Sequence, residues 1–376
     1  MLGYANVYRV FPQPSSTNQH YEFMKRASKS AAKAAQKNEE GNATIIDVAR
    51  RAGVSYATVS RVINKEAYVK EETRQRVLQA LIDLDYVANR QARSLRGGRT
   101  HMIGLLVRDL GTGYIGEIIR GIDLELGERQ YDLLLYTTHG RGRRESDYVT
   151  TLTRGMVDGL LLVLPRTPED YLAELRKSRF PHVLIDHQGV DQTGPAVGAT
   201  NWQGGYDATT YLASLGHRRI GLITGDLSLG CAVDRNEGYR VALHDCGLPD
   251  DPALVVEGDF TQSAGYQKAK ELLCLQDPPS AIFASNDVMA FGVMEAARER
   301  GLRIPEDLSI VGFDDIPQAN SLHPALTTVH QPLEAMGRVA TQMLFGYLAE
   351  PSRAEERIEL PTQLVIRNSC QSYLCR

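Results

Sequence analysis

The chain has 376 residues, 43% of them hydrophobic, and a formal net charge of −4, which is typical of a folded protein of two or three domains. It contains no apolar run long enough to span a bilayer, and the first 25 residues lack the apolar stretch of a secretory signal. We therefore expect a cytoplasmic protein and exclude membrane-spanning and exported ones.

Charge is distributed unevenly along the chain. Residues 1–42 carry 6 basic and 3 acidic side chains, residues 43–99 carry 11 and 6, and residues 100–376 carry 25 and 37. A small basic block ahead of a large acidic body is typical of a nucleic-acid-binding head on a body that repels DNA, although a basic stretch can also be a solvated face.

The first segment, residues 1–42, has no sustained apolar period and contains two prolines and an Ala/Lys-rich stretch. This composition predicts a mostly disordered leader with a frayed helix near Met24–Gln36. Such a leader could add non-specific DNA affinity, or translation could begin at Met24 instead.

Residues 44–64 predict two short helices joined by a tight turn. Gly53 follows the first helix, where a positive φ is expected, and Ser55 can cap the second. The core face of the first helix is predicted to consist of Ile46, Val48, Ala49 and Ala52.

The second helix is predicted to bury Val59, Val62 and Ile63 beside Ala57 or Thr58. Its opposite face carries side chains that can reach bases and phosphates, which favours a helix-turn-helix over an ordinary helical hairpin. These side chains are Tyr56, Ser60, Arg61 and Asn64.

A longer helix is expected from about Glu72 to Asp85 and completes a three-helix head. Its predicted apolar face consists of Val77, Leu78, Leu81, Ile82 and Leu84. Residues 86–100 could form one short helix before Gly97 and Gly98 break it. Because a helix of about eight residues is unstable alone in water, this hinge should fold only when something binds it.

From Met102 the pattern alternates between strands and helices, which predicts parallel sheets with helices on both faces. Two similar halves meet near Ala199–Asn201, and ligands of such folds bind beyond the carboxyl ends of the strands. Strands are expected at Met102–Val107, Asp132–Tyr136, Gly159–Leu164, His182–Ile185, Ile220–Thr224, Ala281–Ala284 and Leu308–Phe313, and helices at Ile115–Glu128, Tyr206–Leu215, Ser263–Leu275 and Val288–Arg300.

The segment Gly111–Gly116 matches GxGxxG, follows a strand and opens a helix, so it raises the alternative of an NAD-dependent enzyme. The glycines begin several residues beyond the strand, however, and the strand at Asp132–Tyr136 is followed by no acidic residue for a ribose hydroxyl. No other catalytic motif is found. The five scattered cysteines form no CxxC pair, which favours reduced thiols over a metal site or disulfides.

Several motifs occur in an order that resembles the lactose/galactose-repressor (LacI-type) family of bacterial transcription regulators, over residues 44–369. They are Thr44–Asn64, Tyr86–Arg90, Ala92–Leu95, Phe283–Gly292, Ile304–Asp315 and Leu364–Arg367. The resemblance implies a small all-α helix-turn-helix head plus an α/β bilobed, periplasmic-binding-protein-like body of two doubly wound parallel sheets. The expected domains are the leader 1–42, the head 43–85, the hinge 86–100 and the body 101–376, whose lobes comprise 101–199 with 329–355 and 200–328 with 356–369.

The resemblance also implies the DNA contacts. Tyr56 and Ala57 lie at the positions where the family varies its base-reading pair, and alanine there can offer only a methyl group. Leu95 matches the leucine that wedges into the minor groove and bends the duplex. The full set of expected contacts is Thr44, Ser55, Tyr56, Ala57, Thr58, Ser60, Arg61, Asn64, Tyr68, Thr73, Asn89, Ala92 and Leu95.

For the effector, the resemblance implies a cleft whose residues suit a sugar, because carboxyl, amide and guanidinium groups pair with vicinal hydroxyls. Arg235 is expected to open a helix and Phe260 to offer a flat apolar face. Two alternatives remain open, since Asn286 could be a helix N-cap and Asp314 could cap a turn. The expected residues are Tyr114, Asp186, Arg235, Phe260, Asn286 and Asp314.

These observations predict a transcriptional repressor, homodimeric or tetrameric, that binds near-palindromic double-stranded operator DNA under control of a small ligand, most simply a sugar. No enzymatic activity, cofactor, metal or membrane partner is expected. The alternatives are a sugar-binding receptor without a DNA role and the NAD-dependent enzyme.

Overall fold

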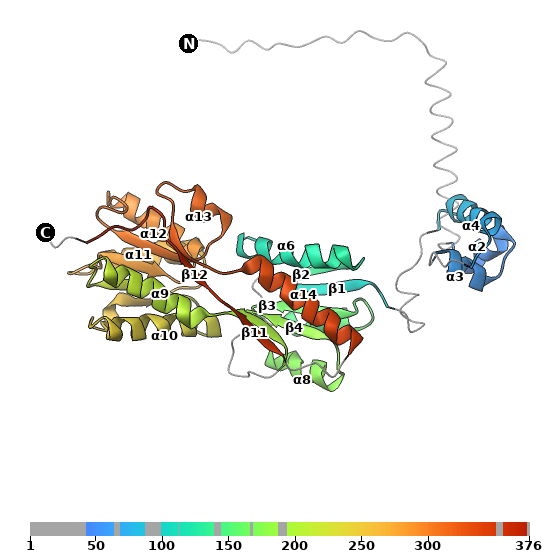
Figure 1. Ribbon diagram of the computed structural model, residues 1–376, viewed down its shortest axis with the longest axis horizontal. Helices are drawn as coiled ribbons and strands as arrows, with labels where there is room; N and C mark the ends of the chain where they lie inside the picture. Colours follow the sequence, from blue (N-terminus) through green and yellow to red (C-terminus); the bar gives the residue numbers. More distant parts are fainter. Residues whose placement is uncertain are drawn as a thin grey trace, which may run out of the picture. The chain divides into compact units, whose positions relative to one another are not determined.

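The computed structural model describes residues 43–63, 68–86, 99–111, 113–138, 144–165, 168–186, 194–350 and 356–373. The chain divides into two compact units, Met1–Arg90 and Gln91–Arg376 (Figure 1). The expected leader, residues 1–42, lies outside the described residues, as does the expected hinge apart from Tyr86, Arg99 and Thr100. Among the described helices, none is long and apolar enough to cross a membrane.

The first unit contains three helices, α2 (Ile45–Ala52), α3 (Tyr56–Ile63) and α4 (Glu71–Asp83). Thr44 and Asp47 form a capping box at the start of α2, in which each side chain binds the other residue's backbone N–H. Gly53 ends this helix with φ +66°, as predicted.

The core of the first unit is built from valines and alanines rather than from the larger apolar residues. Val48, Val59 and Val77 are fully buried, and alanines of α2 and α4 pack beside them. The prediction that Ile46, Leu78 and Ile82 lie on core faces was wrong, because their exposed fractions are 58%, 40% and 73%. The buried stripe of each short helix is narrow, so the residues that flank it reach solvent.

The second unit has two lobes, each with a six-stranded sheet. The first sheet is parallel throughout, in the order β11-β5-β4-β3-β1-β2, and the second is parallel except for β12, which pairs antiparallel with β10, in the order β12-β10-β9-β8-β6-β7. The predicted bilobed α/β body is therefore confirmed. The strand bounds are β1 (Met102–Val107), β2 (Asp132–Thr137), β3 (Gly159–Val163), β4 (His182–Ile185), β5 (Ala196–Ala199), β6 (Ile220–Thr224), β7 (Val255–Glu257), β8 (Ala281–Ala284), β9 (Ser309–Asp314), β10 (Thr327–His330), β11 (Arg357–Leu360) and β12 (Gln363–Val365).

Helices cover both sheets, and apolar side chains between helix and sheet form the cores of the two lobes. The first lobe has α6 (Gly113–Glu128), α7 (Glu145–Thr153), α8 (Glu169–Lys177) and α14 (Leu333–Ala349). The second has α9 (Asn201–Ser214), α10 (Gly230–Asp245), the 3₁₀ turn η2 (Pro252–Leu254), α11 (Gln262–Leu273), α12 (Asp287–Glu299) and α13 (Pro317–Ser321). Figure 1 shows α9–α13 gathered in one lobe and α6, α8 and α14 in the other.

The chain crosses between the lobes three times, after β5, after β10 and after β11. The expected assignment of residues 356–369 to the second lobe was wrong in part. Strand β11 joins the first sheet, where Arg357 pairs with Ala196 and Leu360 with Ala199. The third crossing therefore lies between Leu360 and Gln363, and the ribbon of β11 and β12 (red) continues from one lobe into the other in Figure 1.

Helices α9 and α10 cross at glycines. A Cβ atom on Gly205 would lie 2.4 Å from the Arg235 carbonyl oxygen, and one on Gly238 would lie 2.1 Å from the Trp202 carbonyl oxygen. The two backbones are thus in direct contact beside the lobe crossing. The pairs α11/α12 and α6/α14 cross at glycines in the same way.

Candidate functional site

The head presents most of its predicted DNA-contacting side chains to solvent. Tyr56, Ala57 and Arg61 are exposed on α3, as is Ser55 directly before it. Tyr68, in the loop after α3, is 95% exposed. The remaining described candidates are half-buried or lie at a helix end, namely Thr44, Thr58, Ser60 and Thr73. Asn64, Asn89, Ala92 and Leu95 lie outside the described residues.

Two helix starts in the head are held by candidate DNA contacts. The Ser55 hydroxyl accepts the Thr58 backbone N–H at 3.3 Å, and the two hydroxyl oxygens are 2.9 Å apart. Thr44 caps α2 through its bonds with Asp47. Ser55 therefore fixes the first turn of α3, which carries most of the exposed side chains, and Thr44 fixes that of α2.

The second unit contains a cavity of about 360 Å³ between its lobes. All six predicted effector residues lie on its wall. The first lobe contributes Tyr114 from the first turn of α6 and Asp186 from the end of β4. The second contributes Arg235 from α10, Phe260 before α11, Asn286 at the N-cap of α12 and Asp314 at the end of β9. Arg235 lies in the second turn of α10, so the prediction that it opens a helix was wrong.

The backbone at several of these positions is left-handed. Asp186, Phe260 and Asp314 have φ values of 54°, 68° and 112°, and the cavity residue Leu164 after β3 has 46°. Non-glycine residues adopt this region uncommonly, and such outliers cluster at functional sites. All four of these side chains line the cavity.

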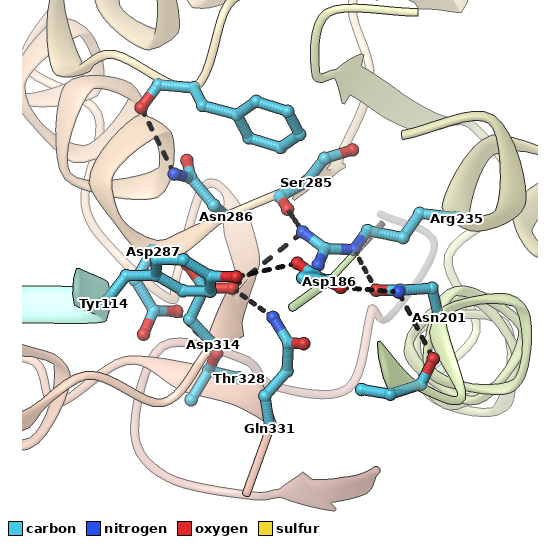
Figure 2. Close-up of polar contacts among 12 residues, drawn as sticks. Tyr114, Asp186, Asn201, Arg235, Ser285, Asn286, Asp287, Asp314, Thr328 and Gln331 are labelled. Carbon is cyan, nitrogen blue, oxygen red and sulfur yellow. Dashed lines mark hydrogen bonds and ion pairs between the residues drawn. The ribbon is translucent and has the colours of Figure 1, made fainter. Parts of the chain in front are cut away.

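A chain of hydrogen bonds connects the two lobes (Figure 2). The Tyr114 hydroxyl donates to Asp186 Oδ2 at 2.8 Å. Asn201 Nδ2 donates to Asp186 Oδ1 at 3.3 Å, and Arg235 Nε donates to Asn201 Oδ1 at 2.8 Å. Asn201, the first residue of α9, therefore bonds to both lobes at once.

Arg235 is held on further sides within the second lobe. Its Nη1 donates to the Ser285 carbonyl oxygen at 2.5 Å and lies 3.9 Å from Asp314 Oδ1, while its guanidinium carbon lies 3.7 Å from the centroid of the Phe313 ring. Gln331 Nε2 donates to the same Asp314 oxygen at 2.7 Å. These contacts fix the guanidinium plane and hold the Asp314 carboxyl group beside it.

Burial controls the acid–base behaviour of the cavity wall. It raises the pKa of Asp314 to about 7, with the charge of Asp186 adding to the effect and Arg235 and Gln331 opposing it. Burial and the charge of Asp314 raise the pKa of Asp287 well above its usual range, although Thr328 and the Ile316 N–H bond to that carboxyl. Burial also raises the pKa of Tyr114, which therefore remains a hydrogen-bond donor.

The structure confirms that Asn286 is a helix N-cap, whereas the Asp314 side chain does not cap the turn that follows it. Asn286 does cap α12, because its Oδ1 accepts the Met289 N–H at 2.8 Å, and its Nδ2 donates to the Phe260 carbonyl oxygen at 3.2 Å. The Asp314 carboxyl group accepts from the Gln331 side chain, whereas the backbone N–H of the following turn, at Ile316, bonds to Asp287.

Sequence reasoning missed five residues around the predicted ones. Asn201, Ser285 and Gln331 form hydrogen bonds with the predicted residues, and Asp287 lies beside Asp314 and bonds to Thr328. Asn201 could have been found, because it lies at the boundary between the two predicted halves. The others have no sequence signal, since their partners are 17 to 50 residues away in the chain.

The GxGxxG segment does not have the geometry of a dinucleotide site. Strand β1 ends at Val107 and α6 begins only at Gly113, so the glycines do not form a tight strand-to-helix turn. A Cβ atom on Gly116 would have no described neighbour within 4 Å, whereas the last glycine of that motif is needed for close helix–strand packing. Gly111 instead lies on the cavity wall.

Comparison with known proteins identifies the family. Residues 44–89 match the bacterial regulatory proteins of the lacI family, and residues 209–370 match a periplasmic binding protein-like domain. The HTH-type transcriptional repressor PurR of Pasteurella multocida is 38% identical over 333 residues, which cover 88% of this chain and 100% of that protein. The chain belongs to the lacI family of bacterial regulatory proteins. It is a DNA-binding transcriptional repressor with a ligand-binding domain.

Solved lacI-family structures agree with this assignment. A lac repressor dimer bound to operator and the anti-inducer ONPF is similar with a TM-score of 0.78 and 28% identity, over 88% of this chain and 99% of that one. The complex of the transcriptional regulator CelR with cellobiose is similar with a TM-score of 0.67 and 33% identity, over 87% and 99%. A receptor without a DNA role is therefore the wrong alternative for this chain.

Proposed function

We propose that the ligand of this repressor is a sugar that binds in the cavity between the lobes and contacts Arg235 and Asp314. One observation carries the proposal. The Arg235 Nη2 nitrogen and the Asp314 Oδ2 oxygen have no hydrogen-bond partner among the described residues, although both side chains are nearly fully buried and line the cavity.

A donor and an acceptor held side by side suit adjacent hydroxyl groups, because each hydroxyl can both donate and accept. The guanidinium group offers a rigid donor, and the carboxyl group offers an acceptor or, when protonated, a donor. Phe260 lines the same cavity and supplies an aromatic face for the apolar side of a sugar ring. The cellobiose complex of CelR supports this ligand class.

We also propose that the protein acts in the cytoplasm as a homodimer whose two heads occupy the half-sites of a near-palindromic operator. A tetramer is the alternative. Arginines and lysines of the head would neutralise phosphates and make the affinity depend on salt. Tyr56 and its exposed neighbours would read bases, and Leu95 would wedge into the minor groove. The operator-bound lac repressor dimer supports this arrangement.

A sugar can change DNA affinity only through its different affinities for two conformations of the repressor, with a coupling of about 1–3 kcal/mol in typical cases. The cavity is suited to this role, because its wall comes from both lobes.

The test is a melting-temperature screen of the full chain with D-ribose, D-glucose and cellobiose, since a ligand that binds the folded state stabilises it by mass action. We expect at least one sugar to raise the melting temperature and Arg235→Lys, which loses the guanidinium fork, to abolish the rise. Arg240→Lys is the matched control, because Arg240 lies on the same helix but pairs with Asp250 at the surface. No response to any sugar, or an unchanged response in Arg235→Lys, would contradict the proposal.

A further inference from the structure

The three crossings between the lobes are short. One residue, Thr200, separates β5 from α9. Gln331 and Pro332 separate β10 from α14, and Pro361 and Thr362 separate β11 from β12. Any change in the angle between the lobes must therefore be absorbed by the backbone at these few residues or immediately beside them.

The first crossing is bonded to the cavity wall through Asn201. This side chain is 1% exposed, donates to Asp186 of the first lobe and accepts from Arg235 of the second. Its backbone directly follows Thr200, and its Nδ2 also donates to the Ala199 carbonyl oxygen at 3.3 Å, so a displacement of the Arg235 guanidinium group reaches the crossing through its hydrogen bond to Asn201.

The second crossing is bonded to the cavity wall through Gln331. Its backbone N–H donates to the Asp314 carbonyl oxygen at 3.2 Å, and its Nε2 donates to the Asp314 carboxyl group at 2.7 Å. Its Oε1 is buried without a partner in the described part of the chain. The amide is therefore oriented by Asp314 alone.

The third crossing is bonded to the first. The Thr362 N–H donates to Thr200 Oγ1 at 2.9 Å, the Thr362 hydroxyl donates to the Thr200 carbonyl oxygen at 3.1 Å, and the two hydroxyl oxygens are 2.9 Å apart. These two crossings should therefore move together.

We propose that Asn201 and Gln331 are positioning residues that couple the ligand contacts Arg235 and Asp314 to the crossings between the lobes. The inference rests on the proposed binding of a sugar at Arg235 and Asp314. A sugar that engages the unpartnered atoms of these two residues shifts them, and their bonds to Asn201 and Gln331 carry the shift to the crossings. The bond from Asn201 to Asp186 carries it to the first lobe.

The test compares Asn201→Ala and Gln331→Met with the matched control Gln203→Ala. Gln203 is exposed on the same helix as Asn201 and bonds to Asp207. The probe is whichever of D-ribose, D-glucose and cellobiose raises the wild-type melting temperature most. Isothermal titration calorimetry measures the affinity of each variant for the probe, so that operator binding is compared at full occupancy.

The decisive readout is the ratio of operator affinities without and with saturating probe. In the wild type and Gln203→Ala we expect a ratio of about 5 to 150. In Asn201→Ala and Gln331→Met we expect a ratio close to one despite full occupancy. A purely structural role would lower the melting temperature and leave this ratio at its wild-type value. A wild-type ratio in either folded variant would overturn the proposal. Gln331→Met keeps the side-chain length and provides the test if Asn201→Ala does not fold.

Amide hydrogen exchange tests the same coupling without a ligand. We expect the Thr362 amide to exchange about fivefold faster in Asn201→Ala than in Gln203→Ala, because a net hydrogen-bond contribution is lost at the crossing. If no sugar binds the wild type, the proposed ligand class is wrong, whereas unchanged exchange at Thr362 would refute the coupling itself.

Discussion

Replacement of Asp314 by asparagine should change how the stability of the body depends on pH. Burial raises the pKa of this carboxyl group from its ordinary 3.8 to about 7. Between these values the folded protein keeps a proton that the unfolded chain has released. The free energy of unfolding therefore falls as pH rises from about 4 to 7, by up to about 1.4 kcal/mol per pH unit.

Across this window of roughly three pH units the loss is on the order of 4 kcal/mol for Asp314. An asparagine cannot ionise and can still accept from Gln331 Nε2, so Asp314→Asn should be more stable than the wild type at pH 8 and similar at pH 4. Some dependence on pH should remain, because the pKa of Asp287 is raised in the same direction.

The assay is urea unfolding of the full chain at pH 4 to 8, followed by circular dichroism. Asp123→Asn, a substitution of an exposed carboxyl group on α6, serves as the control and should keep the wild-type slope. If Asp314→Asn keeps the wild-type slope, or is less stable at pH 8, then the ionised carboxylate stabilises the fold through Arg235 and the reasoning is refuted.

Three further substitutions test other parts of the chain. Gly205→Ala should destabilise the body by about 1–3 kcal/mol and weaken sugar binding, because its Cβ would displace the Arg235 backbone. Gly127→Ala is the control and should leave stability and sugar binding unchanged, because nothing lies within 4 Å of the added Cβ; melting curves compare the two variants. Gly53→Ala should destabilise the head by about 1–2 kcal/mol through its left-handed backbone alone and lower operator affinity in proportion to the unfolded fraction, as thermal melts and gel shifts would show. Leu95→Ala should weaken specific operator binding much more than non-specific binding in gel-shift titrations, and an equal loss would refute the wedge.

The sequence predicted a strand well where an apolar run is buried on both faces and stands between turn residues. Met102–Val107, His182–Ile185, Ile220–Thr224 and Ala281–Ala284 have the expected bounds. Five strands were missed, and each is a run of three or four residues that contains a glycine or a polar residue. The misplaced strand β11 has the same cause, since only its pairing with β5 reveals which lobe it joins.

The cavity residues were predicted through family resemblance, and the fold brings all six to one wall. Their supporting residues could not be predicted in this way. The carboxyl group of Asp314 and the amide of Gln331 are 17 residues apart in sequence, and Arg235 and the Ser285 carbonyl are 50 apart. Hydrophobic periodicity carries no information about such contacts, because they arise where separate loops meet.

The glycine crossing of α9 and α10 has a consequence for changing the ligand specificity of this repressor. Backbone packed on backbone leaves little room for side chains to set the distance between the two helices. The position of the Arg235 Cα atom should therefore change little when other residues of the cavity wall are substituted. New ligand preferences can be introduced at Phe260 or Leu164 while the guanidinium group keeps its place, so the cavity is a favourable starting point for sensors of other small molecules.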